Sequence, residues 1–233
     1  MRKRFLSVLL LLALALTLVS CGEKEEPIPV TRNPLPQLNS PSDGDTIVTI
    51  ETNKGVIRAV LYQKAVPQTV TNFVKLADSG YYDGIIIHKA IADFVIQMGD
   101  PTAEGNGGES FNGAGLPLEY NELLHNFTGA VGMAAGSDGL AYSQFYIVAG
   151  SEVSEEYVSA MKAAGYPANV IEAYQEFGGQ PSFDYEYTVF GQVYEGLELV
   201  QEIAASKTDR WNRPKKDVTV SSISISTYSS TEG

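Results

Sequence analysis

The chain has 233 residues, of which 44% are hydrophobic, and its formal net charge is −12 at pH 7. This acidity argues against nucleic acid and anionic lipid headgroups as electrostatic partners, because both are polyanions. The single cysteine excludes an internal disulfide, so a hydrophobic core must hold the fold together. Residues 46–233 are enough for one domain with such a core.

The first 20 residues have the pattern of a secretory signal peptide. Three basic residues at positions 2–4 precede an uncharged run over 5–19, which is short for a transmembrane helix of about 20 apolar residues. The run ends in Leu-Val-Ser-Cys at 18–21, which resembles a bacterial lipobox. The resemblance implies cleavage after residue 20, a lipid on Cys21 and attachment to the extracytoplasmic face of the cell membrane. An ordinary secretory signal with a chance cysteine is the alternative.

A proline-rich segment follows the leader. Residues 22–45 contain five prolines among polar residues. Because each proline fixes φ and removes a backbone donor, helix and sheet are disfavoured there. We predict that residues 21–45 form a semi-extended tether, which lifts a domain spanning 46–233 off the lipid surface.

The rest of the chain predicts many short strands and few helices. Alternating apolar positions predict strands at 46–52, 55–62, 85–91, 94–98, 128–134, 143–148, 187–193 and 218–227. Helical spacing predicts helices from Pro67 to just before Gly80 and at 157–164, 168–177 and 197–205. The glycine-rich stretch 99–117 predicts a long loop of the kind that is often functional. This pattern indicates a mainly β domain, either a barrel or a sandwich.

Four blocks of sequence occur in the order seen in the cyclophilin family, which the chain resembles. They are Pro-x-Thr-Val-x-Asn-Phe at 67–73, Tyr-Asp-Gly-x-x-x-His-Lys at 82–89 with Phe-x-Ile-Gln-x-Gly-Asp-Pro at 94–101, Gly-Met-Ala-Ala-Gly at 132–136 with Ser-Gln-Phe-Tyr-Ile at 143–147, and Tyr-Thr-Val-Phe-Gly-Gln-Val at 187–193. The resemblance implies a closed eight-stranded antiparallel β-barrel capped by two helices, with the active groove on its outside. Extra residues at about 151–182 are expected to form a helical insertion.

The activity implied by this resemblance is peptidyl-prolyl cis–trans isomerisation. Rotation about an X–Pro bond has a barrier of about 18–20 kcal/mol, because resonance gives the bond double-bond character. A catalyst must bind the twisted imide more tightly than either planar form. This requires a donor aimed at the proline nitrogen, an apolar slot for the ring and groups that hold the peptide backbone. No proton need move, so we expect neither a cofactor nor a metal ion.

Strand alternation predicts which side chains can form such a site. It places one polar set on a common face, Lys89, Gln97, Gln144 and Tyr146, and a second set on the opposite face, His88, Phe145 and Ile147. Lys89 takes the position of the family's catalytic arginine, and we predict that Lys89 and Gln97 are the catalytic pair. An ammonium lacks the planar fork of a guanidinium, so we expect lower activity. A solvated strand lysine is the alternative interpretation.

The resemblance also assigns a substrate-binding set. It comprises Phe94, Val95, Ala134, Ala135, Gln144, Tyr146, Phe183 and Tyr187. Tyr146 replaces a phenylalanine of the family pocket, so its hydroxyl needs a partner or water. Ser182 stands where the family has tryptophan and cannot replace it, so ordinary loop packing is an equal alternative for 182–187. His88 and His125 lack partners at ligand spacing, and we expect a structural role for both.

Two function classes remain open, with a third that is weaker. The leading hypothesis is an isomerase that assists the folding of secreted proteins outside the cytoplasmic membrane, where proline isomerisation is slow. The alternative is a catalytically weak module that binds Pro-containing segments or a partner protein. A small-solute-binding lipoprotein is weaker, because such proteins are usually larger and two-lobed. We expect a monomer that binds X–Pro segments, reaches the membrane through the lipid on Cys21 and binds no nucleic acid.

Overall fold

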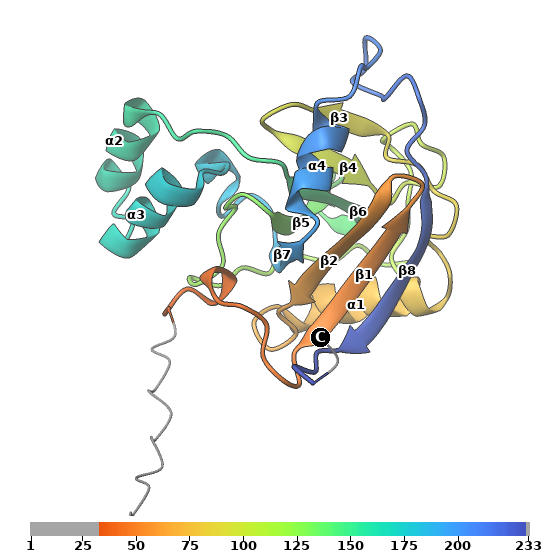
Figure 1. The fold of residues 1–233 in the computed structure, drawn as a ribbon, viewed down its shortest axis with the longest axis horizontal. Coiled ribbons are helices and arrows are strands. Elements are labelled where there is room, and N and C mark those ends of the chain that lie inside the picture. The colour runs from red at the N-terminus through yellow and green to blue at the C-terminus, as the bar shows by residue number, and fades with distance from the viewer. Residues whose placement is uncertain (1–32, 232–233) are drawn as a thin grey trace, which may run out of the picture. The chain divides into compact units, whose positions relative to one another are not determined.

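The structure is a computed structural model that describes residues 33–231. Eight antiparallel strands form one curled sheet in the order β3-β4-β6-β5-β7-β2-β1-β8 (Figure 1). The strands are β1 (Thr46–Thr52), β2 (Gly55–Leu61), β3 (Lys89–Ile91), β4 (Val95–Met98), β5 (Ala130–Ala135), β6 (Ala141–Val148), β7 (Val189–Glu195) and β8 (Val220–Thr227). The helices are α1 (Pro67–Asp78), α2 (Glu155–Ala163), α3 (Ala168–Phe177) and α4 (Leu197–Ala204). The predicted leader and Cys21 lie outside the described residues.

The sheet is open between its edge strands, which corrects the expectation of a closed barrel. No ladder joins β3 to β8 within residues 33–231. Three backbone hydrogen bonds and one isolated bridge, between Ile86 and Thr219, connect residues 84–87 to 218–220. These bonds also explain why the strand predicted at 85–91 keeps only its last three residues. The earlier ones are extended but bond to the start of β8 at isolated points.

Helices α1 and α4 supply apolar side chains to the main core. Pro67 starts α1, and the Glu119 carboxylate accepts hydrogen bonds from the backbone N–H groups of Gln68 and Thr69, which satisfies two free donors of the first turn. The Phe73 ring then packs edge-on against Phe145 at 5.2 Å. Helix α4 contacts β2, β3 and β4. The resemblance implied two helices that cap the sheet. Of the four α-helices in the described residues, α1 and α4 pack on the sheet in this way.

Helices α2 and α3 form a second, smaller core beside the sheet (Figure 1). Its buried members are Leu35, Phe127, Val158, Met161, Val170, Ile171, Ala173 and Tyr174. The Ser154 hydroxyl accepts a hydrogen bond from the backbone N–H of Tyr157 and so caps α2. Both helices lie where the sequence predicted them. None of the helices in the described part of the chain has the length and apolar character needed to cross a membrane.

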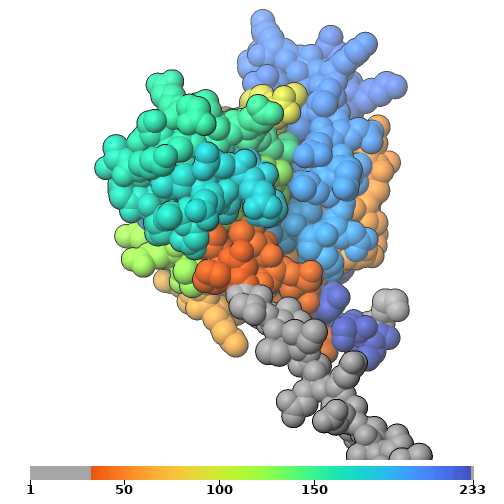
Figure 2. Space-filling view, turned by 60° about the vertical axis from the view of Figure 1, so that its left-hand side comes forward, coloured from red at the N-terminus to blue at the C-terminus, as the bar shows by residue number. Residues whose placement is uncertain are grey.

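Residues 33–45 are packed against the domain rather than extended away from it. Leu35 is 1% exposed and enters the second core, and Gln37 is 5% exposed. The Gln37 side chain exchanges two hydrogen bonds with the backbone of His125, at 2.8 and 2.7 Å. Figure 2 shows this segment against residues of the α2–α3 region. The ordered domain therefore begins before residue 46, and the rest of the predicted tether lies outside the described residues.

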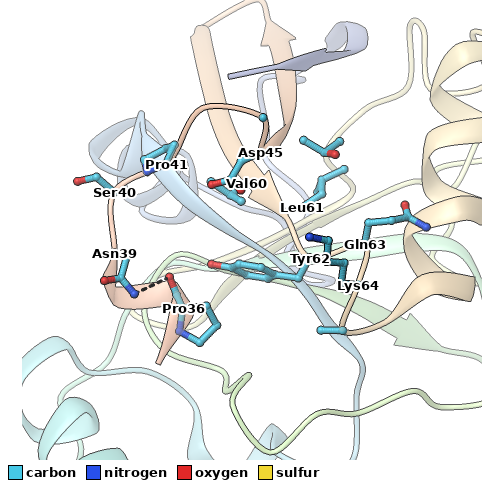
Figure 3. A pocket seen from close by; sticks show the side chains of 13 residues that line it. Pro36, Asn39, Ser40, Pro41, Asp45, Val60, Leu61, Tyr62, Gln63 and Lys64 are labelled. Atoms are coloured by element: carbon cyan, nitrogen blue, oxygen red, sulfur yellow. Dashed lines mark hydrogen bonds between the residues drawn. The ribbon is translucent and has the colours of Figure 1, made fainter. Parts of the chain in front are cut away.

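The packed N-terminal segment forms one wall of a cavity of about 320 Å³ (Figure 3). The opposite wall comes from β2 and the turn after it, including Tyr62. Asn39 donates a side-chain hydrogen bond to the carbonyl of Pro36, which holds the segment in a turn. Burial raises the pKa of the Tyr62 phenol, with a further contribution from Asp45. The segment thus covers Tyr62, directly after β2, and belongs to the fold.

Candidate active site

A row of side chains crosses four adjacent strands on one face of the sheet. Lys89 in β3 pairs with Gln97 in β4, Gln97 pairs with Tyr146 in β6, and Tyr146 pairs with Gly132 in β5. Directly paired residues of an antiparallel sheet point to the same face. A Cβ at Gly132 would collide with the Tyr146 ring, so glycine here lets the ring lie across β5. The structure therefore brings Lys89, Gln97 and Tyr146 together as the alternation predicted.

The opposite face is buried, as expected. His88, Phe145 and Ile147 are 6%, 0% and 0% exposed. Lys89 and Gln97 are only half-buried. Within residues 33–231 the Lys89 ammonium has no hydrogen bond or ion pair, so it is available as a donor to a bound ligand.

Gln97 is oriented by Gln144 rather than by Lys89. Its side-chain amide donates to Gln144 Oε1 at 2.9 Å, and Gln144 Nε2 donates to the carbonyl of Gly107 at 2.8 Å. These two hydrogen bonds use the Gln97 amide N–H and leave its side-chain oxygen, Oε1, without a donor among residues 33–231. That oxygen can therefore accept a hydrogen bond from a peptide N–H. It also ties both glutamines to the glycine-rich loop at 99–117, which the sequence predicted as a functional loop.

Four aromatic rings, which we call the aromatic quartet, lie beside the row: Phe94, Tyr146, Phe183 and Tyr187. Phe183 is at the centre, with ring centroids 5.3 Å from Phe94, 5.4 Å from Tyr146 and 5.0 Å from Tyr187. All three contacts are edge-to-face, the geometry that aromatic pairs favour. Tyr146 is 3% exposed, and the other three rings of the quartet are half-buried. Val95, which was predicted in the same substrate-binding set, is also 3% exposed. The quartet thus brings together four residues of the predicted substrate-binding set that lie far apart in the sequence.

The Tyr146 hydroxyl has an internal partner that the sequence did not reveal. It donates to Asn126 Oδ1 at 2.6 Å, and the backbone and side-chain N–H groups of Asn126 donate to Asp184 Oδ1 at 2.8 and 2.9 Å. Asp184 Oδ2 accepts from the Tyr174 hydroxyl at 2.8 Å and lies 2.9 Å from His125 Nδ1. We call these five residues the Asp184 network. Burial, and secondarily the Asp184 charge, raise the pKa of Tyr146 well above its ordinary value.

The Asp184 network gives the stretch 182–187 a defined conformation. Asp184 directly follows Phe183, and its carboxylate is buried under α3 and the loop at 125–126. Phe183 and Tyr187 are therefore positioned by a fully bonded carboxylate and not by loose loop packing. His125 has the expected structural role, as a member of the Asp184 network. Sequence reasoning missed Asn126 and Asp184 as a pair because 58 positions separate them.

A depression of about 460 Å³ extends the site along the glutamines. Ala134 and Ala135, at the end of β5, line it together with Gln97, Gln144 and the loop at 105–108. Asp100 holds this loop by accepting hydrogen bonds from backbone N–H groups of Thr102, Gly105 and Gly107. Burial opposes ionisation of Asp100, but those hydrogen bonds prevail and lower its pKa. The two alanines thus adjoin the site through a recess that a peptide backbone can enter.

His88 lies beneath the same loop, next to Gly105, and neither of its ring nitrogens has a hydrogen-bond partner among residues 33–231. Desolvation lowers its pKa, so the ring is neutral at pH 7. Within residues 33–231 no three His, Cys, Asp or Glu side chains are grouped as metal ligands would be. His88 is buried beside β3, and a structural role for it stays a prediction.

Comparisons with known proteins show which family the chain is similar to. Residues 47–225 match the family model described as cyclophilin type peptidyl-prolyl cis-trans isomerase. Proteins of Staphylococcus saprophyticus and Staphylococcus aureus, whose names place them among the peptidyl-prolyl cis-trans isomerases, are 41% identical over 191 residues, which is 82% of this chain and 97% of theirs. A cyclophilin type isomerase of Cryptosporidium parvum is 28% identical, with a TM-score of 0.64 over 79% of this chain and 99% of that one. Its crystal structure in the presence of the dipeptide Ala-Pro gives a TM-score of 0.63 over 78% and 99%.

Proposed function

This chain belongs to the cyclophilin-type peptidyl-prolyl cis–trans isomerase family, and from that premise we propose that Lys89 and the aromatic quartet catalyse rotation of X–Pro bonds in exported polypeptides. The observation that carries the proposal is the row Lys89–Gln97–Tyr146. In this row Gln97 separates Tyr146 of the quartet from Lys89, whose ammonium forms no hydrogen bond or ion pair within residues 33–231. We further propose that a lipid on Cys21 holds the enzyme, as a monomer, on the extracytoplasmic face of the membrane.

The chemistry follows from the electronic change during rotation. In the twisted imide the proline nitrogen loses its conjugation and regains a lone pair. The Lys89 ammonium can donate to that lone pair, an interaction that is weak in either planar form. The enzyme then binds the transition state more tightly than the ground state, and each 1.36 kcal/mol of difference gives a tenfold rate increase.

The other residues hold the peptide. The three half-buried rings of the quartet, Phe94, Phe183 and Tyr187, offer apolar faces and edges to the proline ring, which removes apolar surface from water. Gln97 and Gln144 offer amide groups to the peptide backbone at the side next to Lys89. An Ala-Pro dipeptide was present with the Cryptosporidium parvum isomerase, which supports X–Pro segments as the ligand class. No group in this scheme forms a covalent bond or transfers a proton.

The role of Lys89 can be tested by replacing it. We expect Lys89→Ala to lower kcat/KM on an Ala-Pro peptide about tenfold or more, the loss of at least 1.4 kcal/mol of transition-state stabilisation. Lys89→Arg should equal or exceed the wild type, because a guanidinium is a more rigid donor. Turnover is measured by NMR exchange between the cis and trans peptide.

Lys64→Ala is the matched control, since Lys64 is exposed and lies after β2, outside the row. Circular dichroism of each variant checks that it is folded. Equal turnover in the wild type and all three variants would exclude Lys89 from the mechanism.

A binding module without useful turnover remains the second candidate. Three departures from the family pattern favour it: Lys89 in place of the arginine, Ser182 in place of the tryptophan and Tyr187 in place of the histidine. The same NMR experiment separates the two functions: a module shifts peptide resonances at unchanged exchange rate, whereas an enzyme accelerates exchange at substoichiometric concentration.

A further inference from the structure

A cationic, tryptophan-bearing hairpin stands out on an otherwise acidic chain. Five basic residues lie among the ten positions 207–216, in a sequence with 16 basic and 28 acidic residues in total. We call residues 207–216 the basic hairpin. Trp211, the only tryptophan of the chain, lies at its tip and is 65% exposed. In Figure 2 the blue residues between α4 and β8 project from the body of the protein.

The basic hairpin has a defined backbone. Thr208 and Pro214 form a bridge, and the Asp209 N–H and Arg213 carbonyl close the turn with a 2.9 Å hydrogen bond. Asp209 Oδ1 also accepts from the backbone N–H groups of Trp211 and Arg213, at 2.8 and 3.0 Å. A turn held by several bonds presents its side chains in a fixed pattern, which lowers the entropy lost when a partner binds.

Most of its charges have no partner within the described residues. Arg213 pairs with Asp217 at 3.2 Å. The other four cations, Lys207, Arg210, Lys215 and Lys216, are exposed and form no ion pair in residues 33–231. Arg210 instead stacks on the Trp211 ring at 3.7 Å, as a cation does on an aromatic face. An exposed indole among free cations contributes nothing to the core, which points to an external partner.

The basic hairpin borders the candidate active site. The Asn212 carbonyl accepts a 2.8 Å hydrogen bond from the backbone N–H of Ala90, the residue after Lys89. That bond lies on the edge of β3 not paired with β4. A peptide that crosses β3 with its proline at the quartet therefore extends toward the basic hairpin.

We propose that the basic hairpin is a second contact site for client polypeptides. It would favour client segments that carry Asp or Glu a few residues from the proline. This inference rests on the proposed function, because it specifies which X–Pro segments the isomerase would prefer. The carboxylates would meet Lys207, Arg210, Lys215 or Lys216 within the Debye length of about 10 Å at 0.1 M salt, and an apolar client side chain would meet Trp211. An anionic membrane fits less well, because the rest of this acidic chain would be repelled by it.

The experiment compares three Ala-Pro peptides that differ only in flanking residues: two Glu, two Gln or two Lys. With the full chain at low salt, we expect kcat/KM to be highest for the Glu peptide, about two- to tenfold above the Gln peptide, as two exposed charge pairs can give. Adding 0.5 M NaCl should remove the difference. Lys215→Glu with Lys216→Glu should abolish or reverse the preference and leave the Gln peptide unaffected.

Lys162→Glu is the control, since Lys162 is an exposed lysine on α2 and its reversal changes net charge without touching the basic hairpin. Fluorescence of Trp211 reports contact independently of turnover, because no other tryptophan is present. Tighter binding of the Glu peptide with no turnover of any peptide supports this inference and contradicts the proposed function.

Equal kcat/KM on all three peptides, or a preference that survives the double reversal, overturns the inference and leaves the proposed function standing. Vesicles of phosphatidylglycerol that change Trp211 fluorescence, while the three peptides do not, also overturn it in favour of a membrane contact.

Discussion

At the scale of single residues, Tyr146 connects the candidate site to the buried polar interior. Its ring belongs to the aromatic quartet, and its hydroxyl reaches Asn126 and, through it, Asp184. A buried acceptor that loses its donor keeps its desolvation cost, so this hydroxyl matters more for stability than an exposed one does.

Tyr146→Phe tests that connection, with Tyr142→Phe as control. The first change leaves Asn126 Oδ1 without its donor, and we expect the free energy of unfolding to fall by about 1–3 kcal/mol. Within residues 33–231 the Tyr142 hydroxyl bonds only to the exposed Asp138, so loss of this hydroxyl should cost about 0.5 kcal/mol or less. Urea denaturation measures both. Turnover should survive in Tyr146→Phe because the ring is kept; equal unfolding free energies in wild type and Tyr146→Phe would contradict the argument.

His88 predicts a pH dependence of stability. Its folded pKa is depressed, first by desolvation and further by Lys89 and Arg213, against the opposing effect of Asp100. The unfolded chain takes up a proton near pH 6.5 while the folded chain does not, so the free energy of unfolding should decrease as pH falls below about 6.5. Above that pH His88 is neutral in both states and contributes no pH dependence.

Urea unfolding of the wild type and His88→Asn, each at pH 7.5 and 5.5, measures this contribution. Carboxylates titrate alike in both proteins, so the difference between the two pH dependences belongs to His88. We expect the wild type to lose more stability than the variant over this interval. Parallel losses would show that His88 is protonated as readily in the folded as in the unfolded chain.

At the scale of elements, α2 and α3 support the site from outside the sheet. Tyr174 of α3 donates to Asp184, and Asp184 fixes the turn that carries Phe183. The same two helices pack on Phe127 and on Leu35 from the N-terminal segment. The insertion and the N-terminal segment thus share the second core, and the insertion reaches the quartet through the hydrogen bond from Tyr174 to Asp184, which gives the extra residues a structural reason to be there.

Leu35→Ala tests whether the N-terminal segment is part of the fold. Truncating a fully buried leucine typically costs about 2–5 kcal/mol, because a cavity is left behind, and we expect a loss in that range by thermal or urea unfolding. Leu123→Ala is the control, as Leu123 is 47% exposed and should lose far less. If residues 33–45 were only a tether, the two variants would be equally stable.

At the scale of the whole molecule, strand alternation was sufficient to predict the site face but not its support. The period of two is local to each strand and allowed Lys89, Gln97 and Tyr146 to line one surface, and the resemblance assigned these positions to the groove. The Asp184 network requires Asn126, Asp184 and Tyr174 to meet across long sequence separations, which no local pattern encodes. Without this network, the sequence left two interpretations of 182–187 equally open, a pocket wall formed by Phe183 and Tyr187 and ordinary loop packing.

The tether was predicted too long for a related reason. Proline content forecasts an extended backbone from composition alone. One apolar residue, Leu35, and one amide, Gln37, make contacts with the second core and with His125, and such contacts outweigh composition. The closed barrel likewise came from resemblance, whereas the edge strands β3 and β8 have no ladder between them.

A crystal structure of the full chain with an Ala-Pro peptide tests the central claim most directly. We expect the proline ring to contact Phe183 and the other half-buried rings of the quartet, with Lys89 Nζ on the side of the imide nitrogen and the backbone bonded to Gln97 or Gln144. A peptide bound elsewhere, or one whose imide faces away from Lys89, would contradict the account.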